Sequence, residues 1–293
     1  MDIRQLQTFA TVAAELSFTR AAAELHTVQS AVSATIRSLE SDLGVPLFDR
    51  SLRQVRLTSA GEALLPEARK VLDAMRAARD AVDATAGEVT GSVAVGYMTS
   101  VTLVDIPVLL HDFAERHGRV AITLKAAEKG TAGLIDMLRT GELDVALVSV
   151  YQSVPDLNIV PVARSPIHLT VPADHPLVGQ GPVSLDRLGG ERFIDFPDGY
   201  GVRQLTDAAF RAAGIRRPVA LETMDIATMG TLVDNGLGIA FLPEFISDRL
   251  TRVRVVPLEE ELHDMVVQVA TLRSRPLSAA ARALHSLIVE RSA

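Results

Sequence analysis

The spacing of apolar residues changes near residue 90, and this change constrains the fold of the chain more than any other feature. Much of the sequence before residue 88 repeats apolar residues every three or four positions, as amphipathic helices do. From residue 91 onward, short apolar runs typical of strands alternate with helical segments. Strands that alternate with helices predict a parallel sheet covered on both faces. The 293 residues, enough for about two domains, therefore divide into a helical N-terminal part and an α/β part.

Three short helices are predicted before residue 44. The first is expected to bury Ile3, Leu6, Phe9, Ala10, Ala13 and Leu16. The second covers residues 20–25 with Ser17 or Thr19 as its N-cap, and the third begins after Thr27, its expected cap, and ends at Gly44. On the third helix the apolar residues Val32, Ile36, Leu39 and Leu43 share one face, and the opposite face carries Gln29, Ser30, Ser33, Ala34 and Arg37. This division suits a helix that packs inward and reads a DNA groove with its outer face.

A short basic hairpin is predicted after the third helix. Residues 52–58 alternate in polarity and are expected to pair with residues 45–48, and Arg50, Arg53 and Arg56 form a local basic cluster. Helices followed by such a hairpin suggest a winged helix-turn-helix, but a small helical bundle with a solvated face explains the pattern equally well. Charge does not decide between them, because six arginines and six acids cancel within residues 1–58 while the whole chain carries −7.

A long helix is predicted from Ser59, where Ser59 and Glu62 have the spacing of a capping box. Its apolar residues alternate spacings of four and three, which is typical of a coiled-coil seam: Leu64, Ala68, Val71, Met75, Ala78 and Val82. The pattern favours a helix that associates with a second copy of the chain. The alternative, a helix buried in its own domain, requires more apolar residues around its circumference.

The strand and helix pattern restarts after about residue 162, which predicts two similar halves with a ligand cleft between them. Small polar residues precede helices at the expected carboxyl ends of strands: Thr99-Ser100, Gly130-Thr131 and Gly199-Tyr200-Gly201. Helix starts attract carboxylates and other anions. Each residue taken alone is explained as an N-cap, and acids and cations both lie near these loops, so the sign of the ligand stays open.

Several function classes are excluded. The sequence has no cysteine, and its seven histidines lack metal-ligand spacing, so we expect no disulfide and no metal site. Nucleotide-binding, nucleophile-elbow and zinc-protease motifs are absent, and we expect neither an enzyme nor a cofactor. The first residues do not predict a signal peptide, and no apolar run of about 18 residues occurs, so we expect a soluble, cytoplasmic protein without a membrane partner.

Specific motifs then narrow the function. Over residues 2–66 the chain carries, in order, Phe18-Thr19-Arg20-Ala21-Ala22-Ala23-Glu24-Leu25, Gln29-Ser30-Ala31-Val32-Ser33, Ile36-Arg37-Ser38-Leu39-Glu40, Leu43-Gly44-Val45-Pro46-Leu47-Phe48 and Leu57-Thr58-Ser59-Ala60-Gly61. In these motifs the chain resembles the LysR-type transcriptional regulators. The resemblance implies a winged helix-turn-helix and a two-lobed module like that of periplasmic binding proteins. It also implies binding to promoter DNA as a homodimer or homotetramer, modulated by a small molecule between the lobes.

The resemblance also implies site residues. Gln29, Ser30, Ser33 and Arg37 would face the major groove and Arg53 would reach the DNA backbone or minor groove, with Ala34 and Arg56 as further candidates. Many family members carry proline at position 30 and arginine at position 34, so this chain is expected to make fewer charged contacts with DNA. Ser100, Thr131, Tyr200 and Gly201 match positions that line the effector cleft, and Thr99, Gly130, Met224 and Asp225 lie beside them.

We therefore expect a DNA-binding domain at residues 1–58, a dimerisation helix at 59–88 and an effector-binding domain at 91–293. Its first lobe is expected at about 91–161 and 266–293, and its second at about 162–265. The expected effector is a small molecule whose charge stays open, with a carboxylate or another small organic anion as one candidate. Two alternatives remain: a regulator that binds DNA constitutively and has a vestigial cleft, and a solute-binding protein.

Overall fold

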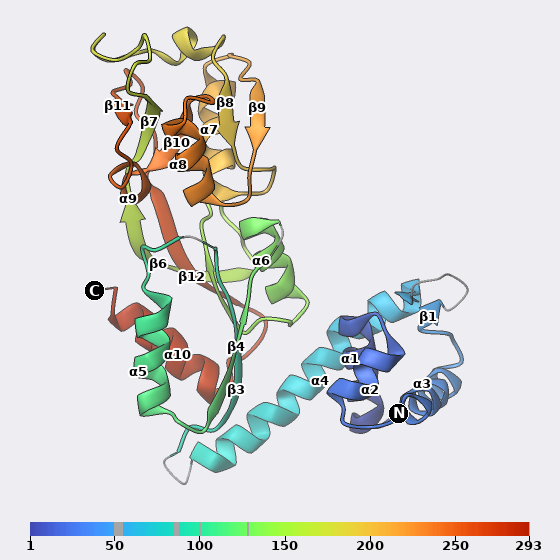
Figure 1. Cartoon of the computed structure of the whole chain (residues 1–293). Helices are drawn as coiled ribbons and strands as arrows, with labels where there is room; N and C mark the ends of the chain where they lie inside the picture. Colours follow the sequence, from blue (N-terminus) through green and yellow to red (C-terminus); the bar gives the residue numbers. More distant parts are fainter. Residues whose placement is uncertain (50–54, 85–87, 100, 128, 293) are drawn as a thin grey trace. The chain divides into compact units, whose positions relative to one another are not determined.

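The computed structural model of the chain describes residues 1–49, 55–84, 88–99, 101–127 and 129–292 (Figure 1). Contacts between residues divide it into two compact units. Unit 1 contains Met1–Val89 with the short segments Arg139–Glu142 and Arg275–Ala279, and unit 2 contains Thr90–Leu138, Leu143–Ser274 and the residues from 280 onward. Among the described residues, no helix is both long and apolar enough to cross a membrane.

Unit 1 begins with the three predicted helices, α1 (Ile3–Glu15), α2 (Phe18–Glu24) and α3 (Gln29–Leu43). Ser17 caps α2, and Gly44, with a φ of +72°, ends α3, both as predicted. The expected Thr27 cap of α3 is wrong, because the N-cap is Val28, which makes no side-chain cap. The Thr27 amide instead donates to the Ala22 carbonyl at 2.9 Å and closes the turn after α2.

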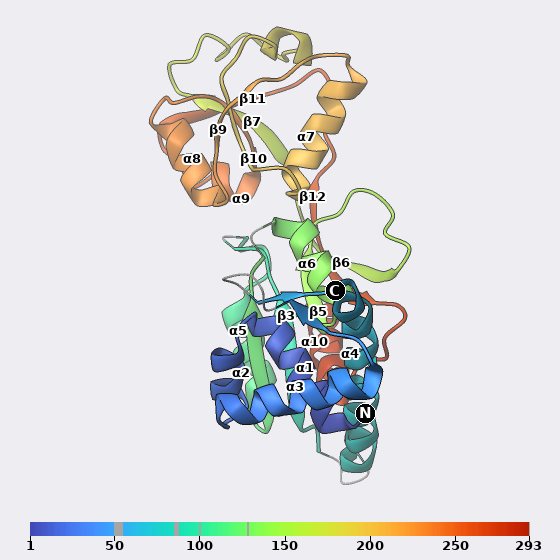
Figure 2. The same cartoon turned by 90° about the vertical axis from the view of Figure 1, so that its right-hand side faces the viewer.

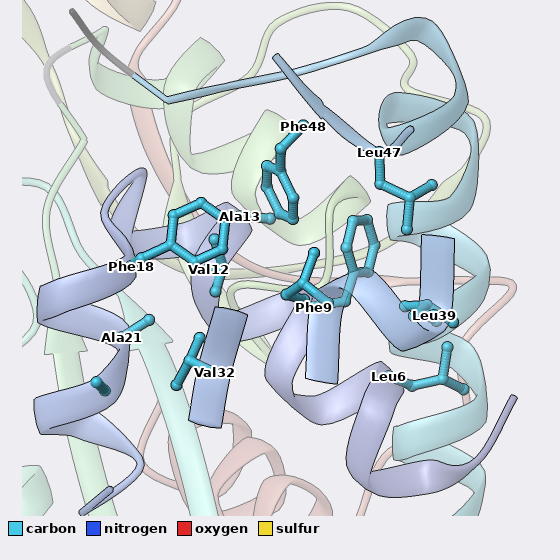
Figure 3. Close-up of a cluster of buried hydrophobic side chains, with 13 residues drawn as sticks. Leu6, Phe9, Val12, Ala13, Phe18, Ala21, Val32, Leu39, Leu47 and Phe48 are labelled. Atoms are coloured by element: carbon cyan, nitrogen blue, oxygen red, sulfur yellow. The ribbon is translucent and has the colours of Figure 1, made fainter. Parts of the chain in front are cut away.

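The helices enclose an aromatic core (Figure 3). The Phe48 ring, from the segment after α3, lies 5.5 Å from Phe9 of α1 and 5.7 Å from Phe18 of α2. Three predicted core residues are exposed instead, namely Ile3 at 40%, Leu16 at 50% and Leu43 at 38%, and all three lie at or next to a helix end. Val12, which the predicted face omitted, is fully buried.

The wing of unit 1 pairs β1 (Phe48–Asp49) with β2 (Arg56–Leu57) in antiparallel fashion, with Phe48 opposite Leu57. The paired strands are shorter than the expected hairpin, and residues 50–54, which include Arg50 and Arg53, lie outside the described part. The long helix α4 (Ser59–Ala84) follows directly. Its cap is Thr58, whose Oγ1 accepts the Gly61 amide at 3.1 Å, so the predicted cap at Ser59 is one residue out of place, and glycine at position 61 has no side chain to complete a capping box.

The apolar seam of α4 divides into two parts. Ala68 is buried and Leu64 is half-buried, and both pack into the core of α1, α2 and α3. Val71 is 45% exposed and Val82 is 68% exposed. The first part of the predicted self-association seam therefore belongs to the chain's own core, and only its later part has an accessible apolar surface.

Unit 2 contains a sheet with the strand order β4-β3-β5-β12-β6. Its strands are β3 (Gly91–Gly96), β4 (Val120–Lys125), β5 (Val145–Val148), β6 (Leu157–Ser165) and β12 (Met265–Leu272). Figure 1 shows α5 (Ile106–Arg116) and α10 (Ala279–Glu290) on one face of this sheet and α6 (Gly130–Arg139) on the other. An ion pair between Asp112 of α5 and Arg291, just after α10, holds the first two together.

A second group of strands forms the other lobe of unit 2 (Figure 2). Its antiparallel sheet has the order β10-β7-β11, and β8 pairs in parallel with β9. The elements are β7 (Ile167–Pro172), a 3₁₀ helix (Leu185–Leu188), β8 (Phe193–Asp195), α7 (Gly201–Ala212), β9 (Val219–Glu222), α8 (Ile226–Asp234), β10 (Ala240–Pro243), α9 (Glu244–Ser247) and β11 (Val253–Val256).

The prediction of a parallel sheet is correct only for β3, β4 and β5 and for the β8–β9 pair. β12 runs antiparallel to both β5 and β6, and β7 is antiparallel to both of its neighbours. Sequence periodicity missed β6, which is followed by β7 after a single residue, Pro166. The expected lobe boundary near residue 162 falls inside β6, and a boundary at Pro166 keeps this strand whole.

Candidate functional site

The first candidate site is the outer face of α3. Val32, Ile36 and Leu39 are buried beneath the helix. Gln29, Ser30, Ala34 and Arg37 are exposed and Ser33 is partly exposed, so all five predicted residues of this helix lie on its accessible side. The Gln29 side chain donates to Ser33 Oγ at 3.2 Å. This face offers amide, hydroxyl and guanidinium groups, which are the groups that read base edges in a major groove.

Glu40 and Thr58 attach the wing to the helices. Glu40 Oε1, on α3, accepts the amides of Leu47 at 2.9 Å and Phe48 at 3.3 Å. Thr58 donates its hydroxyl to the Pro46 carbonyl at 2.7 Å. Glu40, Pro46 and Thr58, which belong to the sequence motifs around α3 and the wing, therefore hold the wing in position. The predicted wing residue Arg56 is exposed on β2, and Arg53 lies outside the described residues.

The second candidate site is a cavity of about 40 Å³ in unit 2, between the starts of α6 and α7. Six of the predicted effector residues line it: Thr99, Gly130, Thr131, Tyr200, Gly201 and Met224. Ser100 lies outside the described residues. Asp225 is not part of the lining, and its carboxylate instead caps α8 by accepting the Thr228 amide at 2.8 Å. Sequence reasoning missed the other lining residues, Tyr97, Met98, Val101, Ala127, Ser149, Phe196, Val202, Ile226 and Met265.

Two glycines allow close contact across this cavity. Gly130 has a φ of +54°, and a Cβ there would lie 2.8 to 2.9 Å from atoms of the Tyr200 ring. A Cβ on Gly201 would lie 2.5 Å from the Ser149 carbonyl oxygen. The Ala132 amide also donates to the Gly199 carbonyl at 3.4 Å. The start of α6 and the loop before α7 therefore meet almost backbone to backbone.

Thr131 and Ser149 form the floor of the cavity and are joined by a hydrogen bond. Thr131 Oγ1 accepts the Ser149 amide at 3.1 Å and lies 3.7 Å from the Met98 sulfur, to which it donates. Ser149 Oγ donates to the Tyr151 hydroxyl at 3.3 Å. Burial raises the pKa of the Tyr151 phenol to about 12, although the hydrogen bond from Ser149 opposes this shift. Thr131 therefore links α6 to the end of β5 as well as lining the cavity.

One wall of the cavity is aromatic. The Phe196 and Tyr200 rings stack with their centroids 4.9 Å apart and their planes 5° from parallel. Burial also raises the pKa of the Tyr200 phenol. None of the lining residues that the structure describes is charged, so the positive ends of α6 and α7 are the groups that favour an anion there.

A larger open hollow of about 580 Å³ adjoins the cavity and shares Tyr97, Met98 and Val101 with it. The first turn of α5 forms part of its wall, and Arg249 lies at it with a guanidinium nitrogen 3.5 Å from Thr102 Oγ1. A molecule too large for the cavity itself thus has adjacent space in which to extend. In the described part of the chain, no group of three His, Asp or Glu residues has the arrangement of a metal site.

Comparison with known proteins assigns both sites to domains of one protein family. Residues 3–62 match the model for "Bacterial regulatory helix-turn-helix protein, lysR family", and residues 86–293 match "LysR substrate binding domain". The transcriptional regulator ShiR from Corynebacterium glutamicum (strain R) is 35% identical over 242 residues, which cover 82% of each protein.

Two solved structures share the fold over the full length of both chains. Full-length OxyR from Pseudomonas aeruginosa is 25% identical with a TM-score of 0.77. CbnR in complex with its target DNA is 23% identical with a TM-score of 0.63. The family models together cover nearly the whole sequence, and each corresponds to one of the two sites described above. The chain belongs to the LysR family of DNA-binding transcriptional regulators and is a regulator with an effector-binding domain, not an enzyme.

Proposed function

We propose that α3 reads promoter DNA with Gln29, Ser30, Ser33, Ala34 and Arg37, and that Arg53 and Arg56 of the wing contact the adjacent backbone or minor groove. The observation that carries this proposal is the division of α3 into a buried face, which includes Ile36, and an exposed polar face, which includes Arg37. Residues 1–58 would then form the DNA-binding domain, and we infer a cytoplasmic location from the DNA target.

Arg37→Ala tests this assignment. An arginine that contacts a base through two hydrogen bonds contributes about 1–3 kcal/mol, so we expect binding to weaken by about 5- to 150-fold. The probe is a duplex that the wild-type protein selects from a random-sequence library, measured by mobility shift. Arg211→Ala, at an exposed position of α7, removes the same charge outside the DNA-binding domain and serves as the control. Equal binding by both variants would contradict the recognition role of α3.

We further propose that the cavity of unit 2 binds a small organic effector, a carboxylate or another anion, through the starts of α6 and α7. The proposal is supported by the two helix starts and by the uncharged lining among the described residues, which leaves backbone groups to receive the anion. The cavity is far smaller than typical ligand sites of about 300–1,000 Å³, so a larger effector would extend into the adjoining hollow of about 580 Å³ or separate the two lobes.

A panel of small carboxylic acids and their matching amides tests the effector class. We expect at least one acid, and not its amide, to raise the melting temperature and to change DNA affinity, since a ligand acts only through its different affinities for two states. An amide that binds equally well would show that charge is not recognised. No response to any compound would favour a vestigial cleft and constitutive DNA binding.

We also propose that α4 joins two copies of the chain in a homodimer or homotetramer. The exposed residues Val71 and Val82 support a seam in the later part of this helix. Residues 59–88 would thus connect the DNA-binding domain to an effector domain at 91–293. Val82→Glu places a charge in the seam and is expected to lower the molar mass measured by light scattering, whereas an unchanged mass would place the interface elsewhere.

A further inference from the structure

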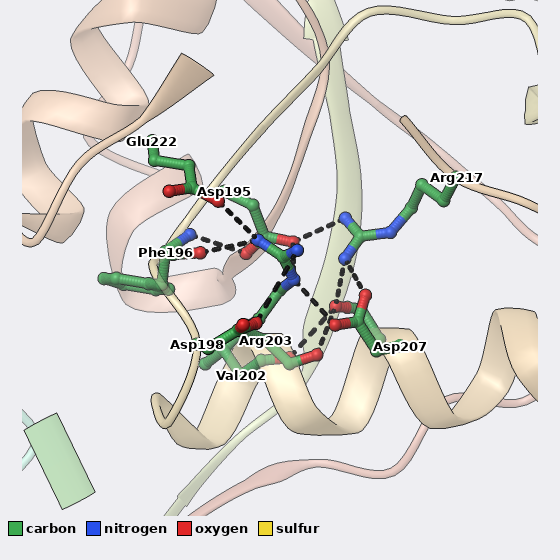
Figure 4. Close-up of polar contacts among 9 residues, drawn as sticks. Asp195, Phe196, Asp198, Val202, Arg203, Asp207, Arg217 and Glu222 are labelled. Carbon is green, nitrogen blue, oxygen red and sulfur yellow. Dashed lines mark hydrogen bonds and ion pairs between the residues drawn. The ribbon is translucent and has the colours of Figure 1, made fainter. Parts of the chain in front are cut away.

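A cluster of charged side chains lies in the second lobe of unit 2 around the backbone of Phe196, with the exposed Asp198 and Glu222 at its edge (Figure 4). Asp195 ends β8, Arg203 and Asp207 lie one turn apart on α7, and Arg217 precedes β9. Arg217 Nη1 lies 2.5 Å from Asp195 Oδ2, and Arg217 Nη2 lies 2.6 Å from Asp207 Oδ1. Arg203 Nε is 2.7 Å from Asp207 Oδ2 and 3.8 Å from Asp195 Oδ2. Opposite charges therefore alternate through the cluster.

Most of the cluster is removed from water, but the side chain of Asp207 is 31% exposed. The side chains of Arg217 and Asp195 are 2% and 5% exposed, and that of Arg203 is 14% exposed. The Arg217 guanidinium lies over the rings of Phe193 and Phe210, at 5.0 and 5.4 Å from their centroids. Burial raises the pKa of the Asp195 carboxyl, although the charge of Arg217 opposes this shift. Buried ion pairs often stabilise a fold no better than apolar residues of the same size, so stability alone is a weak reason for this cluster.

The cluster holds both backbone polar groups of Phe196. The Phe196 amide donates to Asp195 Oδ1 at 2.7 Å, and Arg203 Nη1 donates to the Phe196 carbonyl at 2.7 Å. Phe196 is also the residue whose ring stacks on Tyr200 in the wall of the cavity. Tyr200 directly precedes α7, and Arg203 lies in the first turn of that helix. Arg203 thus connects the end of β8 to the start of α7, between which the two stacked rings lie.

We propose that Arg203 is a positioning residue of the effector cavity, which fixes the Phe196–Tyr200 wall by binding the Phe196 carbonyl while Asp207 anchors the same guanidinium to α7. This inference rests on the proposed function of the cavity, because a fixed wall matters for a ligand that binds there. Preorganised walls of this kind depend on residues behind them whose own geometry is locked. Arg203 does not touch the cavity itself, since it is not among its lining residues.

The geometry requires arginine at this position. Arg203 uses Nε for Asp207 and Nη1 for the Phe196 carbonyl, and Nη1 also lies 3.3 Å from Glu222 Oε1. The planar guanidinium presents these donors at a fixed separation, whereas a lysine ammonium is a single point of charge. Arg203→Lys keeps the charge but is expected to lose one of the two anchors. A role that depended on charge alone would survive this substitution.

The three tyrosines of the chain provide a test that needs no effector. Tyr97 and Tyr200 line the cavity and Tyr151 lies beneath its floor, so full-length protein labelled with 3-fluorotyrosine gives fluorine signals that all report on this region. The signals are assigned with single Tyr→Phe variants. In Arg203→Gln and Arg203→Lys we expect the Tyr200 signal to shift or broaden and its phenol to titrate at lower pH, while the Tyr151 signal stays unchanged. Arg211→Gln, on the exposed face of the same helix, should leave every signal unchanged.

The possible outcomes separate positioning from stability. If Arg203 only stabilises the fold, both variants will unfold at lower urea concentration but show an unchanged Tyr200 signal in their native state, and the proposal fails. It also fails if Arg203→Lys behaves like the wild type, or if neither variant folds, because Arg203 would then be needed for the fold itself. The fluorine result does not depend on whether an effector exists, so it can be distinguished from a failure of the effector panel.

Discussion

Gly130→Ala is the substitution for which the structure gives the clearest magnitude. Two separate penalties act at this position. The backbone φ of +54° is left-handed, which costs a residue with a Cβ about 1–2 kcal/mol. The new Cβ would also lie 2.8 to 2.9 Å from atoms of the Tyr200 ring, and inserting a methyl group into a packed site costs about 1–3 kcal/mol. The sum lowers the free energy of unfolding of unit 2 by about 2–5 kcal/mol.

Gly214→Ala separates the two penalties. Gly214 has a similar φ of +74°, but no atom lies within 4 Å of the Cβ that alanine would add. The Gly214→Ala variant therefore has the backbone penalty alone. Both variants are also stabilised slightly and equally, because alanine makes the unfolded chain less flexible than glycine does. Because all three tyrosines belong to unit 2 and the chain has no tryptophan, tyrosine fluorescence during urea unfolding follows this unit selectively. We expect Gly130→Ala to cost about 1–3 kcal/mol more than Gly214→Ala.

A third variant identifies the clashing group. In a Tyr200→Ala background the ring is absent, so Gly130→Ala should cost no more than Gly214→Ala, within the roughly 0.5 kcal/mol by which independent substitutions add. If Gly130→Ala and Gly214→Ala are equally destabilising in the wild-type background, the close approach of α6 to Tyr200 is not present in solution. The argument for a closed cavity would then fail as well.

Two further predictions concern the floor of the cavity and the wing. The raised pKa of Tyr151, about 12 against 10.0, means that the stability linked to its neutral phenol is complete below pH 10 and is lost as pH rises to about 12, by about 3 kcal/mol. An absorbance titration should show a late phenol step that is missing in Tyr151→Phe, and an unchanged titration of this variant would contradict the prediction. In unit 1, a Cβ on Gly61 would lie 2.3 Å from the Leu47 carbonyl oxygen, so Gly61→Ala should move the wing and lower the free energy of unfolding by about 1–3 kcal/mol. Urea unfolding followed by circular dichroism measures this loss, and Ser59→Ala, at an exposed position of the same helix, is the control variant. Equal stability of the two variants would contradict the close contact at Gly61.

The sequence predicts local features well and tertiary ones poorly. Helix α3 and its stop at Gly44 follow from periodicity and from one glycine, because both are determined within a few residues. The strand direction of β12 could not be predicted in this way, since its partners β5 and β6 lie more than 100 residues earlier. Apolar runs indicate strands but carry no information on which strand they pair with. The mixture of parallel and antiparallel strands in this sheet is therefore visible only in the structure.

The candidate sites show the same division. The helix starts at Thr131 and Gly201 were predictable, because small polar residues and glycines mark such positions locally. Phe196 and Met265 read as ordinary strand residues, and nothing in their neighbours indicates that both line one cavity. Arg217 is harder still, because a single arginine before a strand predicts a solvated side chain, whereas this one is 2% exposed. Its burial depends on Asp195 and Asp207, which three-dimensional packing alone brings to it.

These contacts bear on how an effector could act. The two lobes meet at the cavity, with Gly201 against Ser149 and Gly130 against Tyr200. A state held by such contacts does not open to admit a ligand without losing them. An effector changes DNA binding only if it stabilises the open or the closed arrangement more than the other, by roughly 5.5 kcal/mol for a nearly complete switch. Substitutions that weaken the closed contact, such as Gly130→Ala, should therefore mimic a ligand that favours the open state, and should change DNA affinity without touching α3.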